Sequence, residues 1–166
     1  MSKDRQSLID EAVAFHVPRY AELPNMGLYL EQVLDVVNGS LEYLDHGKLT
    51  KPMISNYIKN GVMASPERKR YSRDHLCYLI VIDILKPVFT LQQIGEFLEV
   101  QKSTYPLEVA YDYFCSEFEN ALAEAFRFTG MPLPSIESKR TEQTILIRSL
   151  VLTAANRVFA EKAFLS

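Results

Sequence analysis

The sequence has little of what catalysis and metal binding usually require. Its 166 residues include only three His and two Cys, and no His stands at metal-ligand spacing from another His, a Cys or an acidic residue. The six Gly are isolated, so neither a Gly-rich phosphate loop nor a Gly-x-Ser-x-Gly turn occurs. We therefore expect that the chain is not an enzyme and has no catalytic residues, cofactor or metal.

Long apolar runs and a secretion signal are also missing. No apolar run approaches the ~18–20 residues that a membrane-spanning helix needs. The first residues, MSKDRQSLIDEA, lack the apolar core of a signal peptide. Cys77 and Cys115 each lie within an apolar helical pattern, which predicts buried reduced thiols rather than a disulfide or a metal pair. These observations predict a cytoplasmic protein without a membrane partner.

The sequence also lacks the alternation of polar and apolar residues that is typical of a β-strand. Only residues 62–71 could pair with themselves, and a Pro-rich stretch at 129–138 predicts a loop. Apolar residues instead recur at helical spacing in the segments 5–15, 28–44, 51–60, 73–86, 91–100, 107–125 and 139–164. The sequence therefore predicts a mainly α fold.

What the sequence does have is a basic segment in an otherwise acidic chain. Residues 48–75 contain seven of the eighteen Lys and Arg but only two acidic residues, a formal balance of +5, whereas the whole chain is −3. A run of like charge is often only a solvated face. Here it coincides with a short helix, a loop that carries Arg68, Lys69 and Arg70, and the start of another helix.

Local signals predict where these helices begin and end. Thr50 suits an N-cap whose hydroxyl accepts a first-turn amide, and Gly61 suits a left-handed C-terminal stop. Ser72 suits the cap of the next helix, and Thr90 with Gln93 forms a capping box for the one after. A helix of about nine residues is unstable alone, so 51–60 must pack on its neighbours, as the second helix of a helix-turn-helix does.

This order of elements favours a winged helix-turn-helix that binds double-stranded DNA. A short helix in the major groove reads base edges with polar side chains, while Lys and Arg on an adjoining loop bind phosphates. We expect helix 51–60 in the groove and a basic wing at 66–73 on the backbone. The groove-facing residues would be Lys51, Ser55, Asn56 and Lys59, and the backbone-facing residues Arg68, Lys69, Arg70 and Arg73.

Two resemblances support this interpretation. The run TKPMISNYIKNGVM, then RKRYSRDHL, then FTLQQIGEFL resembles the DNA-binding head of MerR-type transcription regulators, in which a recognition helix ends in Tyr-x-x-x-Gly and a basic wing closes on Tyr-Ser. More extensively, LPNMGLYLEQVLDVVN together with LTKPMISNYIKNGVM resembles a bacterial family known only as domain of unknown function 1836. The second resemblance implies a MerR-like regulator but brings no established ligand.

The MerR resemblance assigns roles by position. It places Ser55 where the family commonly has a DNA-contacting Arg, Lys69 at the wing's Arg position, and Tyr71 as the anchoring Tyr of the wing. The metal-sensing cysteines of MerR-type sensors are missing, so metal sensing is not expected.

We therefore expect two parts. Residues 1–100 would form the MerR-like head with an N-terminal helix, and residues 101–166 a C-terminal helical bundle or region for dimerisation or sensing. The apolar helix near 145–155 fits a homodimer interface and equally the centre of a monomeric bundle. A small-molecule effector stays open, and so does an alternative function: a protein–protein adaptor whose helix-turn-helix-like head binds an acidic partner.

Overall fold

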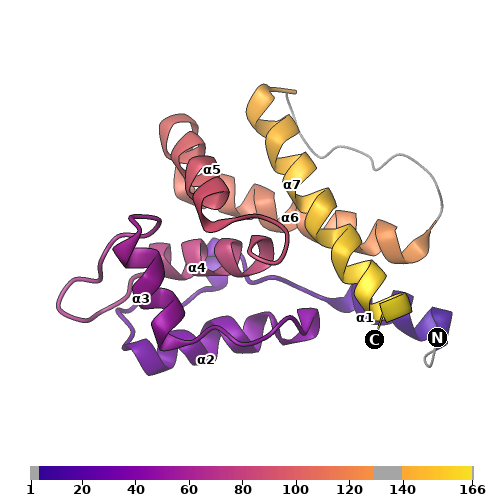
Figure 1. Ribbon diagram of the computed structural model, residues 1–166, viewed down its shortest axis with the longest axis horizontal. Coiled ribbons are helices and arrows are strands. Elements are labelled where there is room, and N and C mark those ends of the chain that lie inside the picture. Colours follow the sequence, from indigo (N-terminus) through magenta and orange to yellow (C-terminus); the bar gives the residue numbers. More distant parts are fainter. Residues whose placement is uncertain (1–3, 129–139, 166) are drawn as a thin grey trace. The chain divides into compact units, whose positions relative to one another are not determined.

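The computed structural model describes residues 4–128 and 140–165. Seven α-helices form in this part of the chain: α1 (Arg5–Ala14), α2 (Leu30–Ser40), α3 (Lys51–Lys59), α4 (Arg73–Leu85), α5 (Leu91–Thr104), α6 (Leu107–Arg127) and α7 (Glu142–Ala160) (Figure 1). The described residues contain no strand, only two isolated β-bridges. The mainly α prediction is confirmed. The loop expected at 129–138 lies outside the described residues.

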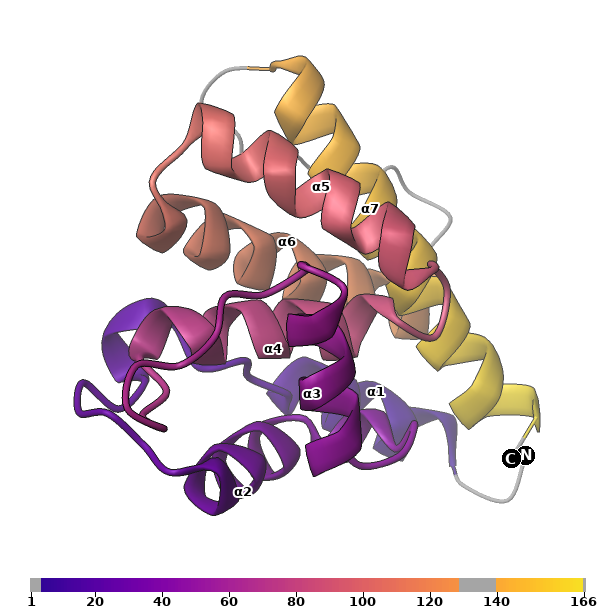
Figure 2. The ribbon, with the colours of Figure 1, turned by 60° about the vertical axis from the view of Figure 1, so that its left-hand side comes forward.

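The chain divides into two compact units, one formed by Pro18–Asp112 and the other by Met1–Val17 with Tyr113–Ser166. The first unit contains α2, α3, α4, α5 and the first residues of α6. Its core is built on α4, which α2 and α5 contact (Figure 2). The α4 side chains of Leu76, Leu79, Ile80, Ile82 and Leu85 are fully buried. Because α4 is buried on several sides, it supports the elements that surround it.

Two helix bounds in this unit differ from those expected. The segment 28–44 is not one helix: α2 ends at Ser40, and a 3-10 turn, Glu42–Leu44, leads to Asp45 with a left-handed φ of 52°. Helix α5 does not end near residue 100 but continues to Thr104, whose hydroxyl donates to Val100 O at 2.8 Å. The helix ends there because Tyr105 precedes Pro106, and the residue before a proline disfavours helical backbone; Tyr105 is extended, with φ −136° and ψ 147°.

The second unit contains α1, most of α6, and α7. Its core is aromatic: Phe118 stacks on Phe114 at a centroid distance of 6.5 Å and meets the ring of Phe15 edge-on at 6.4 Å. The Val17 N–H donates to Glu119 Oε2 at 2.8 Å, so a half-buried carboxylate on α6 holds the backbone that follows α1. Such contacts fix the ends of this unit to its centre.

Both cysteines are buried and form no disulfide, as predicted. None of the helices in residues 4–128 and 140–165 combines the length and apolar character that crossing a bilayer requires. In the same residues, no three His, Cys, Asp or Glu side chains are grouped so that they could hold a metal ion.

Candidate nucleic-acid interface

The basic segment begins with α3, whose ends have the predicted local structure. Pro52 lies in the first turn, where backbone amides have no intrahelical partner. Gly61 has φ +71°, the left-handed backbone that glycine adopts without penalty, and it ends the helix. Thr50 is the N-cap residue, but its side chain makes no capping hydrogen bond, so that detail of the prediction is wrong.

Packing and one side-chain amide hold α3 in place. Ile54 and Tyr57 face inward and are 1% and 5% exposed. Asn38, on α2, makes two hydrogen bonds with the backbone of Leu49, just before α3. Its Nδ2 donates to Leu49 O at 3.1 Å, and its Oδ1 accepts from Leu49 N at 2.8 Å. The amide therefore ties the residue before the N-cap to α2.

A buried charged cluster lies in the same core. Asp83 of α4 is 2% exposed, and its Oδ1 lies 2.7 Å from Lys86 Nζ. His46 Nε2 lies 3.4 Å from Asp83 Oδ2, within ion-pair range but without hydrogen-bond geometry. Burial, and secondarily the charge of Asp83, raises the pKa of Tyr57 to about 12. The inner face of α3 therefore meets a region where charge is costly unless it is paired.

The outer face of α3 carries the four side chains expected to face DNA. Lys51, Ser55, Asn56 and Lys59 are all exposed. Two of them have partners: Lys51 Nζ pairs with Glu31 of α2, and Asn56 Oδ1 accepts from Asn60 Nδ2 at 2.9 Å. Ser55 and Lys59 have no hydrogen-bond or ion-pair partner among the described residues.

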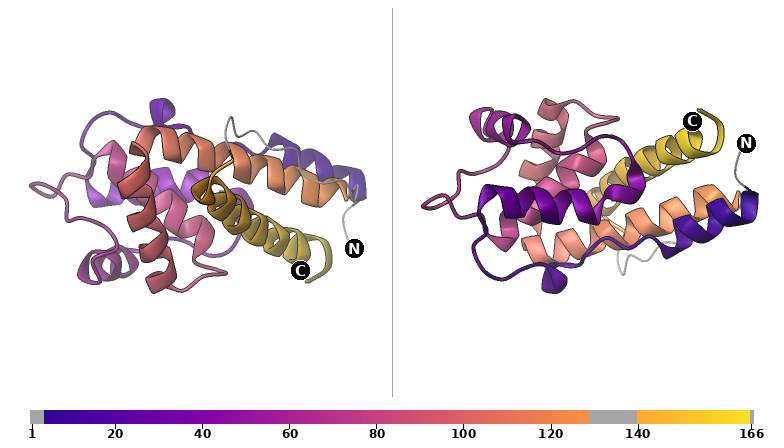
Figure 3. Two further views of the ribbon diagram at one scale, coloured as in Figure 1. Left: turned by 90° about the horizontal axis from the view of Figure 1, so that it is seen from above. Right: turned by 90° about the horizontal axis from the view of Figure 1, so that it is seen from below.

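The basic loop, residues 62–70, connects α3 to α4 and extends away from the helices of its unit (Figures 1 and 3). At its tip Arg70 N donates to Glu67 O at 2.8 Å, closing a turn whose central residues, Arg68 and Lys69, have φ of 50° and 62°. Positive φ at both central residues defines the type I′ class of tight turn, which normally takes Gly, Asn or Asp. Two long cationic residues there carry backbone strain.

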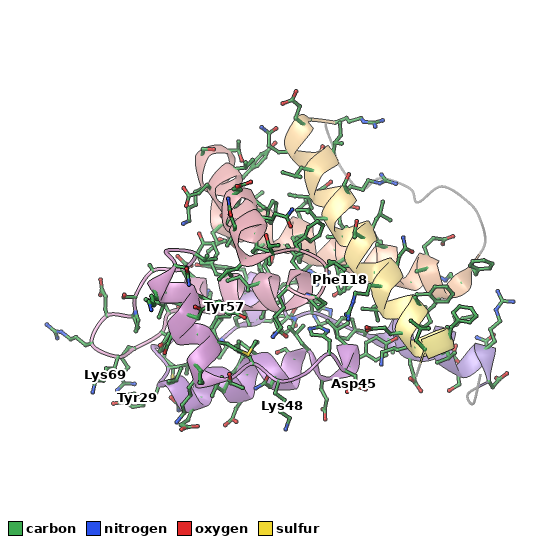
Figure 4. All side chains as sticks on the ribbon, viewed as in Figure 1. Tyr29, Asp45, Lys48, Tyr57, Lys69 and Phe118 are labelled. Atoms are coloured by element: carbon green, nitrogen blue, oxygen red, sulfur yellow. The ribbon has the colours of Figure 1, made fainter. Side chains whose placement is uncertain are left out.

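Both tip cations are free of counter-ions. Arg68 and Lys69 are exposed, and neither has an acidic partner within residues 4–128 and 140–165. Figure 4 shows Lys69 at the loop, close to Tyr29, and Tyr57 among the inner side chains of the same unit.

The base of the loop is held by residues distant in sequence. Arg70 places its guanidinium 3.8 Å from the centroid of the Tyr29 ring and donates to Gly27 O at 3.1 Å. Tyr71 pairs with Leu28 through two backbone hydrogen bonds of 2.8 and 2.9 Å, and its side chain is only 7% exposed. A Cβ at Gly27 would meet Arg70 Cβ at 3.0 Å, so a larger residue there would force Arg70 to shift by a few tenths of an ångström.

His75 connects the loop to the start of α4. Its Nδ1 accepts from Ser72 N at 3.0 Å, which completes the predicted cap at Ser72, and its Nε2 lies 3.1 Å from Ala64 O. Because a carbonyl only accepts, this geometry assigns the ring proton to Nε2. The ring therefore joins the helix cap to the loop backbone.

Arg73 is placed differently from the tip residues. It is half-buried, and its guanidinium lies 4.9 Å from the centroid of the Tyr20 ring. The Tyr20 hydroxyl donates to Asp74 Oδ1 at 2.9 Å, and this hydrogen bond raises the pKa of Tyr20.

The nine predicted site residues therefore fall into two groups. Six are exposed on α3 and the loop tip, and three hold the loop base or the start of α4: Arg70, Tyr71 and Arg73. Sequence reasoning missed the supporting residues Gly27, Tyr29 and His75. Their contacts with the loop span many residues, and only the Ser72-x-x-His75 spacing was a visible signal.

Comparisons with known proteins add one result. A family model described as domain of unknown function (DUF1836) matches residues 18–114, more than half of the chain. The match begins where the unit Pro18–Asp112 begins and ends just beyond it. No significant match was found among curated proteins or solved structures.

Proposed function

We propose that this chain, which belongs to the DUF1836 family, is a DNA-binding transcriptional regulator with a MerR-like winged helix-turn-helix head. Helix α3 would enter the major groove, and the basic wing at 66–73 would lie on the phosphate backbone. The N-terminal part of the chain would supply this head, and the C-terminal helices a dimerisation or sensing region. A homodimer acting in the cytoplasm belongs to the same proposal.

One observation carries the proposal. A short helix buries one face and exposes polar side chains on the other, and the turn that follows exposes Arg68 and Lys69 at its tip, where no acidic side chain of the described residues pairs with them. Exposed Ser and Asn can hydrogen-bond base edges, and unpaired cations neutralise phosphates. The strained turn adds weight, because strain of this kind clusters at functional sites.

The contacts of the cations indicate different roles in DNA binding. Arg68, Lys69 and Lys59 are free to meet phosphates, whereas Arg70 and Arg73 already lie over aromatic rings. Guanidinium groups retain further donors when stacked, so Arg70 can still contact DNA at the base of the wing. Position 55 is Ser instead of the Arg that is common in MerR-type regulators. We therefore expect α3 to contact bases through hydrogen bonds from Ser55 and Asn56.

The proposal is tested by selecting bound sequences from a random pool of duplex DNA with the full chain. We expect enrichment of a defined motif, and an inverted repeat if the protein binds as a homodimer. Replacing Arg68, Lys69 and Arg70 together by Glu should abolish binding. The single substitution Lys69→Gln should reduce the dependence of log K on log salt by ~1 for any sequence.

The matched control is Arg127→Gln, which removes an exposed cation from the other unit. This change should leave the salt dependence of DNA binding unaltered. DNA binding that survives the triple reversal would refute the proposed wing.

A second candidate is an adaptor that uses the same surface to bind an acidic protein. The observation that favours it is the engagement of several cations: Lys51 with Glu31, Arg70 with Tyr29 and Arg73 with Tyr20. Fewer free cations mean fewer neutralised phosphates and weaker DNA binding. Absence of DNA binding at ~50 mM salt, where electrostatic attraction is strong, would favour the adaptor.

A further inference from the structure

A cavity of about 210 Å³ opens in the unit that contains α1, α7 and most of α6. Its apolar lining consists of Leu8, Phe126, Phe128, Phe159, Ala163 and Phe164. Among the described residues of the lining, only Arg5 is charged. Figure 3 shows α1 alongside the last turns of α6, which bring Arg5 and Phe126 to one site. The composition is that of a ligand pocket, mostly apolar with one placed polar group.

The aromatic walls are arranged around one ring. Phe159 meets Phe126 edge-on at 5.2 Å, stacks on Phe128 at 6.0 Å and meets Phe164 edge-on at 5.6 Å. Phe128 and Phe164 are nevertheless 73% and 68% exposed, so the cavity is open to solvent on that side. Large apolar side chains left open to water in this way mark a binding surface.

Phe128 occupies its place at a cost in backbone energy. Its φ is +54°, an outlier for a bulky residue, and its amide still donates to Glu124 O at 3.0 Å. Phe128 is the first residue after α6, and in this conformation its ring stacks on Phe159. A strained residue that completes a cavity wall is a second, independent sign of a binding role.

Arg5 determines the charge of the ligand. Its Nη2 donates to Arg127 O at 3.0 Å, which fixes the guanidinium beside the end of α6, and it has no acidic partner among the described residues. The remaining guanidinium donors match the two oxygens of a carboxylate. A cationic ligand would be repelled, and a purely apolar one would leave these donors unused.

We propose that this cavity binds a small amphipathic monocarboxylate, with its hydrocarbon part among the four Phe rings and its carboxylate on Arg5. An apolar cavity of ~150 Å³ holds benzene, so the available space suits a hydrocarbon part of roughly six to ten carbon atoms. All the lining residues lie outside the DUF1836 match, so binding of a ligand here can be measured without DNA.

The test is calorimetric titration of the full chain with octanoate, octanol and octylamine, which share a chain length and differ in head-group charge. We expect octanoate to bind with a Kd below about 1 mM, a level normal for a ligand of this size, and octylamine to bind at least about tenfold more weakly. Arg5→Gln should weaken octanoate about tenfold and leave octanol unchanged. Arg127→Gln is the matched control and should change none of the three affinities, because the Arg127 side chain does not line the cavity.

Phe128→Gly tests the wall without endangering the fold, since glycine accepts the positive φ at this position. It should weaken octanoate and octanol alike. Failure of octanoate to bind up to several times that concentration would overturn the proposal. Octanoate affinity unchanged in either Arg5→Gln or Phe128→Gly, or equal affinity for octylamine, would overturn it as well.

Discussion

Helix α3 and the basic loop are adjacent in the chain, yet they are held by different kinds of interaction. The inner face of α3 is buried with Ile54 and Tyr57 in the core of its unit. The loop is exposed over most of its length and is held at its base by the stacking of Arg70 on Tyr29, one backbone pairing and one histidine. The position of α3 is therefore tied to the stability of the whole unit, and that of the loop to a few local contacts.

This difference separates two kinds of perturbation. Changes beneath α3 should unfold the unit before they alter the surface that α3 presents. Changes in the loop should alter that surface while the unit stays folded.

The largest effect is expected at the buried cluster. Asp83→Ala should lower the free energy of unfolding by about 3 kcal/mol, because it leaves Lys86 without its buried counter-charge and removes the carboxylate that faces His46. Urea denaturation followed by circular dichroism measures this loss. Asp35→Ala removes an exposed carboxylate from α2 and should cost less than about 0.5 kcal/mol. Equal costs for the two variants would show that the cluster contributes no specific support.

An intermediate effect is expected at alkaline pH. The pKa of Tyr57 is about 12 in the folded chain against an ordinary value of 10.0, so the unfolded chain loses this proton first as pH rises. The stabilising contribution is fully present below pH 10 and disappears as pH passes through about 12, a loss of about 2 to 3 kcal/mol. Burial also raises the pKa of Tyr71 and Tyr78, which adds to the slope.

The variant Tyr57→Phe isolates the contribution of that residue. Its stability should fall less steeply than that of the unmodified chain between pH 10 and 12, in denaturant titrations at fixed pH. Parallel curves for the two proteins would assign the alkaline loss to other groups.

The smallest effect is expected at the loop tip, where backbone and charge can be separated. Lys69→Gly and Lys69→Ala remove the same charge, but only glycine accepts φ of 62° without strain. The Gly variant should therefore be about 1 kcal/mol more stable than the Ala variant by thermal denaturation. Both should lower the salt dependence of the proposed DNA binding by the same ~1. A Gly variant no more stable than the Ala variant would show that the turn is not strained.

Local signals made α3 and its neighbours predictable. The left-handed stop at Gly61 and the caps at Ser72 and Thr90 all depend on residues within four positions of one another. The observed helix Lys51–Lys59 ends one residue before the expected bound. Thr50 shows the limit of this reasoning, because a good capping residue need not use its side chain.

Contacts between distant residues could not be predicted. The pairing of Leu28 with Tyr71 and the stacking of Arg70 on Tyr29 join segments that no periodicity relates. The same holds for the Phe-lined cavity, which gathers Arg5, Phe126 and Phe164 from remote parts of the chain. Contacts of this kind can be identified only once the path of the folded backbone is known.

Asn38 has a consequence for the chemical lifetime of the protein. It precedes Gly39, and an Asn-Gly pair is where the backbone nitrogen of the following residue most readily displaces the side-chain amide. Here Gly39 lies inside α2 and the amide is occupied on both sides by Leu49, which restrains that attack. Deamidation to aspartate or isoaspartate would replace the Nδ2 donor by a carboxylate oxygen, which can only accept and would face Leu49 O. Deamidation during storage would therefore first loosen the segment that leads into α3. Peptide mass spectrometry of an aged sample detects this change.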